Sequence, residues 1–380
     1  MTWRLALAEV ALSDADVDAY LDRLRSGWLT MGPSTQRFEA AFAAYLDVPH
    51  AVAVSSGTAA LHLALLSAGI GPGDEVIVPA FTFVAAANAA RHVGAEPVLC
   101  DSVGALDPVI GPDAVARLTT PHTKAVIVRH TMGYAAPVSG LRAHCDAHGI
   151  RLIEDASEAL GAVAEGGASR VGTVGDLGTF SFRSSTQLPI GEGGMVVTGD
   201  EIFAGRVRTL RSHAMTSVTW DRHRGHAASY DVVDIGFNYR LDEPRAALGI
   251  SRLERLDAEL DHRRERLRRY RDRLRAVPGV ELPWRDDEVE RSSPSAFAIL
   301  LASRDVRDRV RNVLTEEGIQ TTSHPMLSEL TEYLSYKAPG GFPHAESFAE
   351  RHCVLPFSPV MRDDQIELAT DAVAAVLREP

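Results

Sequence analysis

The sequence predicts an α/β fold in which a large domain with a mostly parallel central sheet precedes a smaller C-terminal α+β domain. Between residues 51 and 200, short apolar runs alternate with helical patterns. This alternation is typical of parallel strands covered by helices on both faces. From 244 to 276, an Arg-, Glu- and Leu-rich pattern predicts one long amphipathic helix. We therefore place the large domain at 1–250, with an N-terminal arm, and the linking helix and small domain at 251–380.

The predicted elements follow the apolar spacing of the chain. In the N-terminal arm, Ser13 and Asp16 match an acidic variant of the capping box. Phe38, Phe42 and Leu46 then share one helical face. In the large domain, apolar runs predict buried strands at 52–54, 76–78, 98–99, 125–128, 151–153 and 179–182. In the small domain, the pattern predicts a strand at 296–301 and a helix at 306–317.

Composition narrows the class of protein. The 380 residues carry a formal net charge of −12, which argues against nonspecific nucleic-acid binding. No apolar run approaches a membrane span, and the N-terminus lacks a signal-peptide pattern. The three cysteines are not at metal-binding spacing. We expect a cytoplasmic protein without disulfides or a metal site, whose partner is a small molecule rather than nucleic acid or a membrane.

Polar motifs follow the predicted strands, where active sites of open α/β sheets lie. Ser56, Gly57 and Thr58 follow a strand and open a helix, so they suit either a phosphate or an ordinary N-cap. Asp155 leaves another buried strand, and it needs a partner there unless it caps a helix. Phe83 is either a core residue or an aromatic wall of a binding site.

In this order, the motifs resemble the DegT/StrS family of sugar aminotransferases, which are fold-type I pyridoxal-phosphate (PLP) enzymes. The matches span roughly residues 25–360 and include Ser181-Phe182, the run Gly-Glu-Gly-Gly at 191–194, and Asn238 in Gly-Phe-Asn-Tyr-Arg. The resemblance implies that Asn238 reaches the phosphate in a neighbouring subunit, and hence a homodimer with shared sites.

The resemblance also assigns roles in cofactor binding. It implies that Gly57, Thr58 and Ser181 hold the PLP phosphate. Phe83 then stacks on the pyridine ring. Asp155 pairs with the protonated ring nitrogen, which keeps the ring an electron sink.

The position of the family's Schiff-base lysine falls on Thr186. A hydroxyl cannot form an imine with an aldehyde and is a poor base at neutral pH. The chain has only two lysines, Lys124 at the expected entry end of a strand and Lys337 in a distant loop. Neither is a credible substitute. The chain is thus identified as an atypical family member, with an engineered lysine mutant as the alternative.

Other titratable residues are candidates for the lost lysine's duties. Glu158 stands where the family usually has Gln or His facing the cofactor's phenolic oxygen. A carboxylate in a dry cleft can have a raised pKa, so we hypothesise that Glu158 moves protons, the alternative being an edge residue. His130 and His324 fall on family positions near the site, and each is otherwise structural. Arg183 suits an anion or faces solvent.

Three functions remain open from the sequence. In the first, PLP or its amine form PMP binds noncovalently and a keto-sugar loses a hydroxyl group, with Glu158 or His130 as the base. In the second, no cofactor binds, and the cleft carries out acid–base chemistry such as cyclisation or isomerisation. In the third, the chain is an inactive partner or mutant. Retention of the phosphate motifs favours the first. The family acts mainly on nucleotide-linked sugars for antibiotics or glycans, but nothing in the sequence names a substrate.

Overall fold

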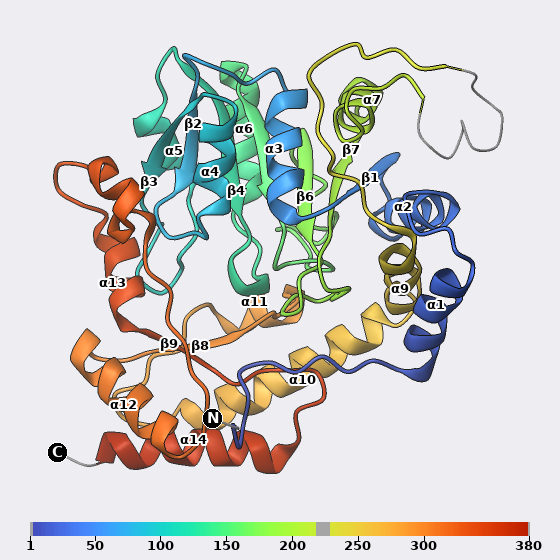
Figure 1. Ribbon diagram of the computed structural model, residues 1–380. Helices are drawn as coiled ribbons and strands as arrows, with labels where there is room; N and C mark the ends of the chain where they lie inside the picture. The colour runs from blue at the N-terminus through green and yellow to red at the C-terminus, as the bar shows by residue number, and fades with distance from the viewer. Residues whose placement is uncertain (1–2, 218–228, 379–380) are drawn as a thin grey trace.

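The computed structural model describes residues 3–217 and 229–378, and its centre is a seven-stranded sheet (Figure 1). The strand order is β1-β7-β6-β5-β4-β2-β3, and β7 is antiparallel to both of its neighbours while β6, β5, β4, β2 and β3 pair in parallel. This confirms the predicted mostly parallel sheet. The strands are β1 (His50–Val54), β2 (Glu75–Pro79), β3 (Glu96–Cys100), β4 (Thr123–Arg129), β5 (Arg151–Asp155), β6 (Leu177–Ser181) and β7 (Gly194–Thr198).

Helices cover both faces of this sheet because its strands are apolar on both sides. In β4, Ala125 and Ile127 belong to one apolar core, and Val126 and Val128 to the other, as expected for side chains that alternate along a strand. The first core includes α3 (Gly57–Ser67), α4 (Ala85–His92) and α7 (Glu201–Leu210). The second includes α2 (Pro33–Leu46), α5 (Pro112–Leu118), α6 (Val138–His148) and α9 (Glu243–Leu253).

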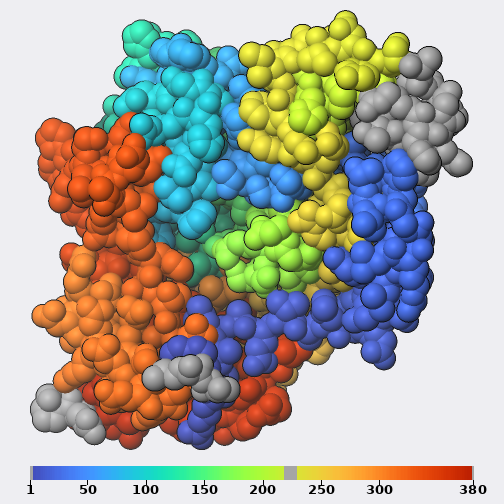
Figure 2. Space-filling model, viewed as in Figure 1, coloured from blue at the N-terminus to red at the C-terminus, as the bar shows by residue number. Residues whose placement is uncertain are grey.

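The N-terminal arm ties the two parts of the chain together. The capping box predicted at Ser13 and Asp16 is confirmed at the start of α1 (Asp14–Arg25). Before it, Leu5 forms a parallel bridge with Ile319. In Figure 2, the blue arm runs across the visible face beside the orange C-terminal part.

The C-terminal part packs helices around a two-stranded antiparallel sheet. Its strand and helix predicted at 296–301 and 306–317 are confirmed within two residues. The domain boundary at residue 250 stays a prediction. The elements of the C-terminal part are α10 (Leu256–Leu274), α11 (Asp286–Arg291), β8 (Phe297–Leu300), α12 (Arg304–Glu316), α13 (Pro343–Arg351), β9 (His352–Leu355) and α14 (Asp363–Arg378), with short 3-10 turns η2 (Leu327–Glu329) and η3 (Thr331–Tyr336). A further 3-10 turn, η1 (Thr131–Gly133), follows β4 in the large domain.

The single long helix predicted at 244–276 is wrong, because the chain breaks between α9 and α10. At the break, Arg255 donates hydrogen bonds to Ser13 (2.7 Å) and Asp16 (2.6 Å). Arg252 donates to the backbone oxygen of Ala11 (2.8 Å). These contacts with the arm are invisible to helical periodicity. Within the described residues, no helix is long and apolar enough to cross a membrane, and no His, Cys, Asp or Glu cluster suits a metal ion.

Candidate active site

A cleft of about 250 Å³ lies where β4, β5 and β6 end and α3 begins. This is the edge of a parallel sheet at which ligands bind in open α/β folds. The cleft unites eight of the residues that the sequence singled out with others that were not predicted. Its lining residues are Ser56, Gly57, Thr58, Leu61, Phe83, Ala85, Arg129, Asp155, Ser157, Glu158, Ser181, Arg183 and Glu192.

The start of α3 forms a cradle for an oxyanion. Ser56 caps the helix by accepting a hydrogen bond from the backbone N–H of Ala59 (3.1 Å). The free amides of the first turn and the helix dipole favour negative charge at this end. A Cβ atom on Gly57 would lie 2.8 Å from the Cβ atom of Ser181. Glycine therefore allows the helix start to approach the end of β6 closely.

Asp155 and Phe83 suit a flat, cationic ring. The Asp155 side chain is 6% exposed, and it accepts a hydrogen bond from the backbone N–H of Ser157 (3.1 Å). The Phe83 ring is 66% exposed although it is large and apolar. An exposed aromatic face beside a buried carboxylate matches the needs of a protonated pyridine ring. The residues of this cleft therefore fit PLP or PMP.

Glu158 is held as an anion, which corrects the expectation of a raised pKa. One carboxylate oxygen lies 2.8 Å from Arg129, and the other lies 2.8 Å from Arg183. Burial alone would raise the pKa of Glu158, but the positive charges of Arg129 and Arg183 lower it to about 2. At neutral pH this carboxylate has no proton to donate, and it is too weak a base to take one.

His130 lies behind the cleft and does not line it, contrary to the expectation of a base near the ligand. Its side chain is fully buried, with Nε2 2.9 Å from Glu154 and Nδ1 accepting from the backbone N–H of Ala136 (3.1 Å). Consecutive side chains leave a strand in opposite directions. Arg129, the residue before His130, is therefore the one that reaches the cleft.

Thr186 is a turn residue in this structure. Its side chain is 1% exposed, and its hydroxyl donates to the backbone oxygen of Arg183 (2.9 Å). Neither it nor a lysine lines the cleft. Lys124 donates to the backbone oxygen of Pro121, and Lys337 lies 3.9 Å from Glu346, both at exposed positions.

His324 and Asn238 lie outside the cleft lining. Burial of the His324 ring by surrounding protein lowers its pKa, whereas the negative charge of Glu158 raises it, so the ring is within electrostatic reach of the cleft. His324 as a whole residue is nevertheless exposed to solvent. Asn238 is exposed on a segment that forms an antiparallel bridge with Ser212.

Sequence reasoning missed Arg129, Ser157 and Glu192. Arg129 carried a usable signal, because it is the first charged residue after the apolar run at 125–128 and so marks the end of a strand. Ser157 lies two residues after Asp155, and Glu192 lies in the Gly-Glu-Gly-Gly run. Nothing in their spacing distinguished cleft side chains from surface ones.

Comparisons with known proteins agree with the fold. Residues 11–374 match the DegT/DnrJ/EryC1/StrS aminotransferase family. The erythromycin biosynthesis sensory transduction protein EryC1 of Saccharopolyspora erythraea is 37% identical over 369 residues, covering 96% of this chain and 95% of that protein. The spore coat polysaccharide biosynthesis protein SpsC of Bacillus subtilis is 34% identical over 375 residues, covering 96% and 94%.

Among solved structures, DesV of S. venezuelae in complex with a ketimine intermediate superposes with a TM-score of 0.90 at 34% identity, covering 100% of both chains. The chain belongs to the DegT/DnrJ/EryC1/StrS aminotransferase family. Its homologues in this family are sugar aminotransferases. The family implies a PLP-type cofactor and a small-molecule sugar substrate.

Proposed function

We propose that this chain binds PLP or PMP without a covalent bond and acts on a keto-sugar or a similar carbonyl metabolite, by a dehydratase-like reaction rather than ordinary transamination. One observation carries the proposal. The residues suited to the cofactor's phosphate and ring line one cleft, while both lysines of the chain lie outside it. A cleft free of phosphate would have no need of this combination.

In this proposal, Gly57, Thr58 and Ser181 hold the phosphate, Phe83 covers the ring, and Asp155 keeps the ring nitrogen protonated. The bound cofactor supplies an electron sink for the substrate carbon. The geometry supports a place for Glu158 as well, because its charge is compensated and need not repel the cofactor. Arg129 and Arg183 then act by positioning that carboxylate.

The proton-moving group that we propose is His324. The lowered pKa of its ring favours the neutral form at pH 7, which can accept a proton. Glu158 stays ionised and His130 is enclosed, so neither supports that duty. His324→Asn should reduce turnover about a hundredfold, the lower end of what a general base contributes. His344→Asn, at an exposed histidine outside the cleft, is the matched control.

The direct test incubates the purified chain with PMP and a series of nucleotide-linked keto-sugars, and follows the sugar by mass spectrometry. Loss of one water from the sugar, dependent on PMP and on Asp155, supports the proposal. Gain of an amino group at catalytic rates would instead mean ordinary transamination. Turnover without PMP would favour cofactor-free acid–base chemistry, and neither turnover nor PMP binding would favour an inactive partner or mutant.

We further propose a homodimer with shared sites. Val232, Val233 and Ile235 are 53%, 60% and 85% exposed on the segment that leads to Asn238. Exposed apolar side chains in one segment suit a protein interface. Light scattering during size exclusion should give twice the chain mass, and Ile235→Lys should shift it toward one chain mass. A cytoplasmic location stays a prediction.

A further inference from the structure

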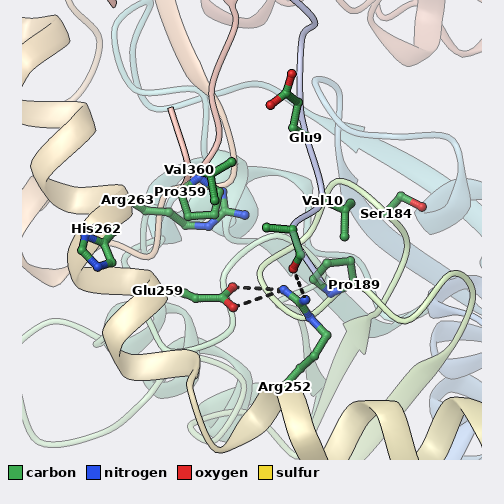
Figure 3. A pocket seen from close by; sticks show the side chains of 11 residues that line it. Glu9, Val10, Ser184, Pro189, Arg252, Glu259, His262, Arg263, Pro359 and Val360 are labelled. Atoms are coloured by element: carbon green, nitrogen blue, oxygen red, sulfur yellow. Dashed lines mark hydrogen bonds and ion pairs between the residues drawn. The ribbon is translucent and has the colours of Figure 1, made fainter. Parts of the chain in front are cut away.

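A second, smaller cavity is lined in part by Ser184 and Pro189, which flank Thr186 in the sequence (Figure 3). Its volume is about 90 Å³, well below the roughly 300 Å³ of ordinary small-molecule sites. The N-terminal arm, the segment after β6, helices α9 and α10, and the turn before α14 each contribute to its wall. The cavity has room for a small ion with water, but not for a sugar or a nucleotide.

The ion pairs around this cavity leave out one guanidinium group. Asp16 and Glu259 each lie within ion-pair distance of both Arg252 and Arg255. These two carboxylates therefore compensate two guanidinium groups. Arg263, which also lines the cavity, forms no ion pair within the described residues. Glu9 and Glu259 also line the cavity, but neither carboxylate forms an ion pair with Arg263 within the described residues.

Arg263 is also poorly satisfied in its hydrogen bonds. Arg263 is 6% exposed. It donates long hydrogen bonds to the backbone oxygens of Pro294 (3.3 Å) and Thr186 (3.5 Å). Among the residues that the structure describes, its buried Nε atom has no hydrogen-bond partner, and neither has the Nε atom of Arg252, which also lines the cavity. Figure 3 shows the carboxylate of Glu9, at the rim, turned away from Arg263. Burial of a charge without a partner is costly.

We propose that this cavity binds a small oxyanion, the carboxylate of a small organic acid or inorganic phosphate, against Arg263. The ion supplies the direct anionic partner that Arg263 lacks and accepts hydrogen bonds from its guanidinium group. It also steadies the segment behind the cleft. Arg263 contacts Thr186, and a bridge between Arg183 and Gly191 closes the segment at its ends. This inference is independent of the proposed function.

The test is calorimetric titration of the full chain with sodium acetate in a chloride-free buffer. We expect one acetate per chain, and Arg263→Gln should weaken its binding about tenfold or more, as for a lost charge-assisted hydrogen bond. Arg264→Gln is the matched control, because Arg264 is the next residue of α10, pairs with Asp261 and does not line this cavity. Its acetate affinity should equal that of the unmodified chain.

A second variant keeps the test valid if Arg263→Gln misfolds. Val10→Trp fills the cavity from its partly exposed rim without removing a bond of Arg263. It should also weaken acetate binding.

Inorganic phosphate is titrated in a separate experiment into Gly57→Ala, because this variant disturbs the phosphate cradle of the cleft. If this variant binds phosphate but not acetate, phosphate is the ion of the cavity. Absence of binding by both probes, or unchanged affinity in Arg263→Gln and Val10→Trp, would overturn the proposal.

Discussion

At the residue scale, Glu158 connects the charges of the cleft to the proposed base. Its carboxylate raises the pKa of His324, whereas Arg129 and Arg183 lower it. Glu158→Gln removes the anion and leaves both arginines, so the pKa of His324 must fall. Because a base works only when neutral, the acid limb of the pH–rate profile should move to lower pH. Glu165→Gln, at an exposed site outside the cleft, should leave it in place.

The pH dependence of kcat, measured for the unmodified chain and both variants, tests this effect. If the acid limb of Glu158→Gln were unchanged or lay at higher pH than in the unmodified chain, His324 would not be the group that titrates. Glu158 itself should add no limb near neutrality, because its pKa of about 2 keeps it ionised throughout that range.

For some residues of the site the sequence predicts the position in the cleft, and for others it does not. Gly57, Phe83 and Asp155 could be predicted to share a cleft, because each lies in a motif at a strand end. The neighbours Arg129 and His130 could not be assigned correctly, since one reaches the cleft and the other is buried against Glu154. That outcome depends on the strand's exact end and on a contact 24 residues away in sequence.

At the element scale, the close approach of α3 to β6 should control cofactor affinity. In Gly57→Ala, the new methyl group would meet Ser181 at 2.8 Å, so the helix start must move away. We expect about tenfold weaker binding of PLP, from the loss of one or two charge-assisted hydrogen bonds to its phosphate. Gly205→Ala, in the middle of α7 with nothing within 4 Å of the new methyl, is the control.

Fluorescence titration with PLP gives both affinities. The control should bind as the unmodified chain does and gain about 0.5–1 kcal/mol of unfolding free energy, since alanine favours a helix interior over glycine. Equal PLP affinity in Gly57→Ala and Gly205→Ala would remove α3 from the phosphate site.

The junction of α1 with the α9–α10 break should give a pH-dependent contribution to stability. Burial alone would raise the pKa of Asp16, but hydrogen bonds from Arg255 and others lower it from 3.8 to about 2. A lowered pKa stabilises the fold above the ordinary value, and this stabilisation is lost as pH falls from about 3.8 to about 2. Asp16→Asn should therefore cost about 2 kcal/mol of unfolding free energy at pH 7.

Urea unfolding of Asp16→Asn and of its exposed neighbour variant Asp14→Asn, at several pH values, measures this contribution. The deficit of Asp16→Asn should shrink as pH falls below 3.8, while Asp14→Asn should stay within about 0.5 kcal/mol of the unmodified chain. A deficit that is constant with pH would mean that packing, rather than charge, holds the arm at this point.

Elements were predictable where one local pattern decides them. The strands of the parallel sheet and the helix face of Phe38, Phe42 and Leu46 are fixed by apolar spacing. The break between α9 and α10 depends instead on Arg252 and Arg255 reaching the N-terminal arm, more than 200 residues earlier in the chain. Periodicity within the helix carries no trace of such contacts.

At the scale of the whole molecule, the order of the motifs predicted the family, whose model matches residues 11–374, while the proposed chemistry depends on the threonine at position 186. The residues proposed as phosphate cradle, ring wall and ring-nitrogen partner line one cleft at the ends of the parallel strands. The charge balance of the cleft and of the cavity behind it could not be predicted, because it arises from arginines that distant segments bring together.

The central claim is that this cleft holds a vitamin B6 cofactor without a lysine. The most direct measurement loads the chain with PLP, desalts it, treats it with borohydride, denatures it and determines the protein mass and the released cofactor. The unmodified chain should retain PLP through desalting and then release all of it, with no mass added to the protein. Thr186→Lys should instead gain the mass of reduced cofactor at residue 186. A covalent adduct on the unmodified chain, or no retained cofactor in a folded protein, would contradict the account.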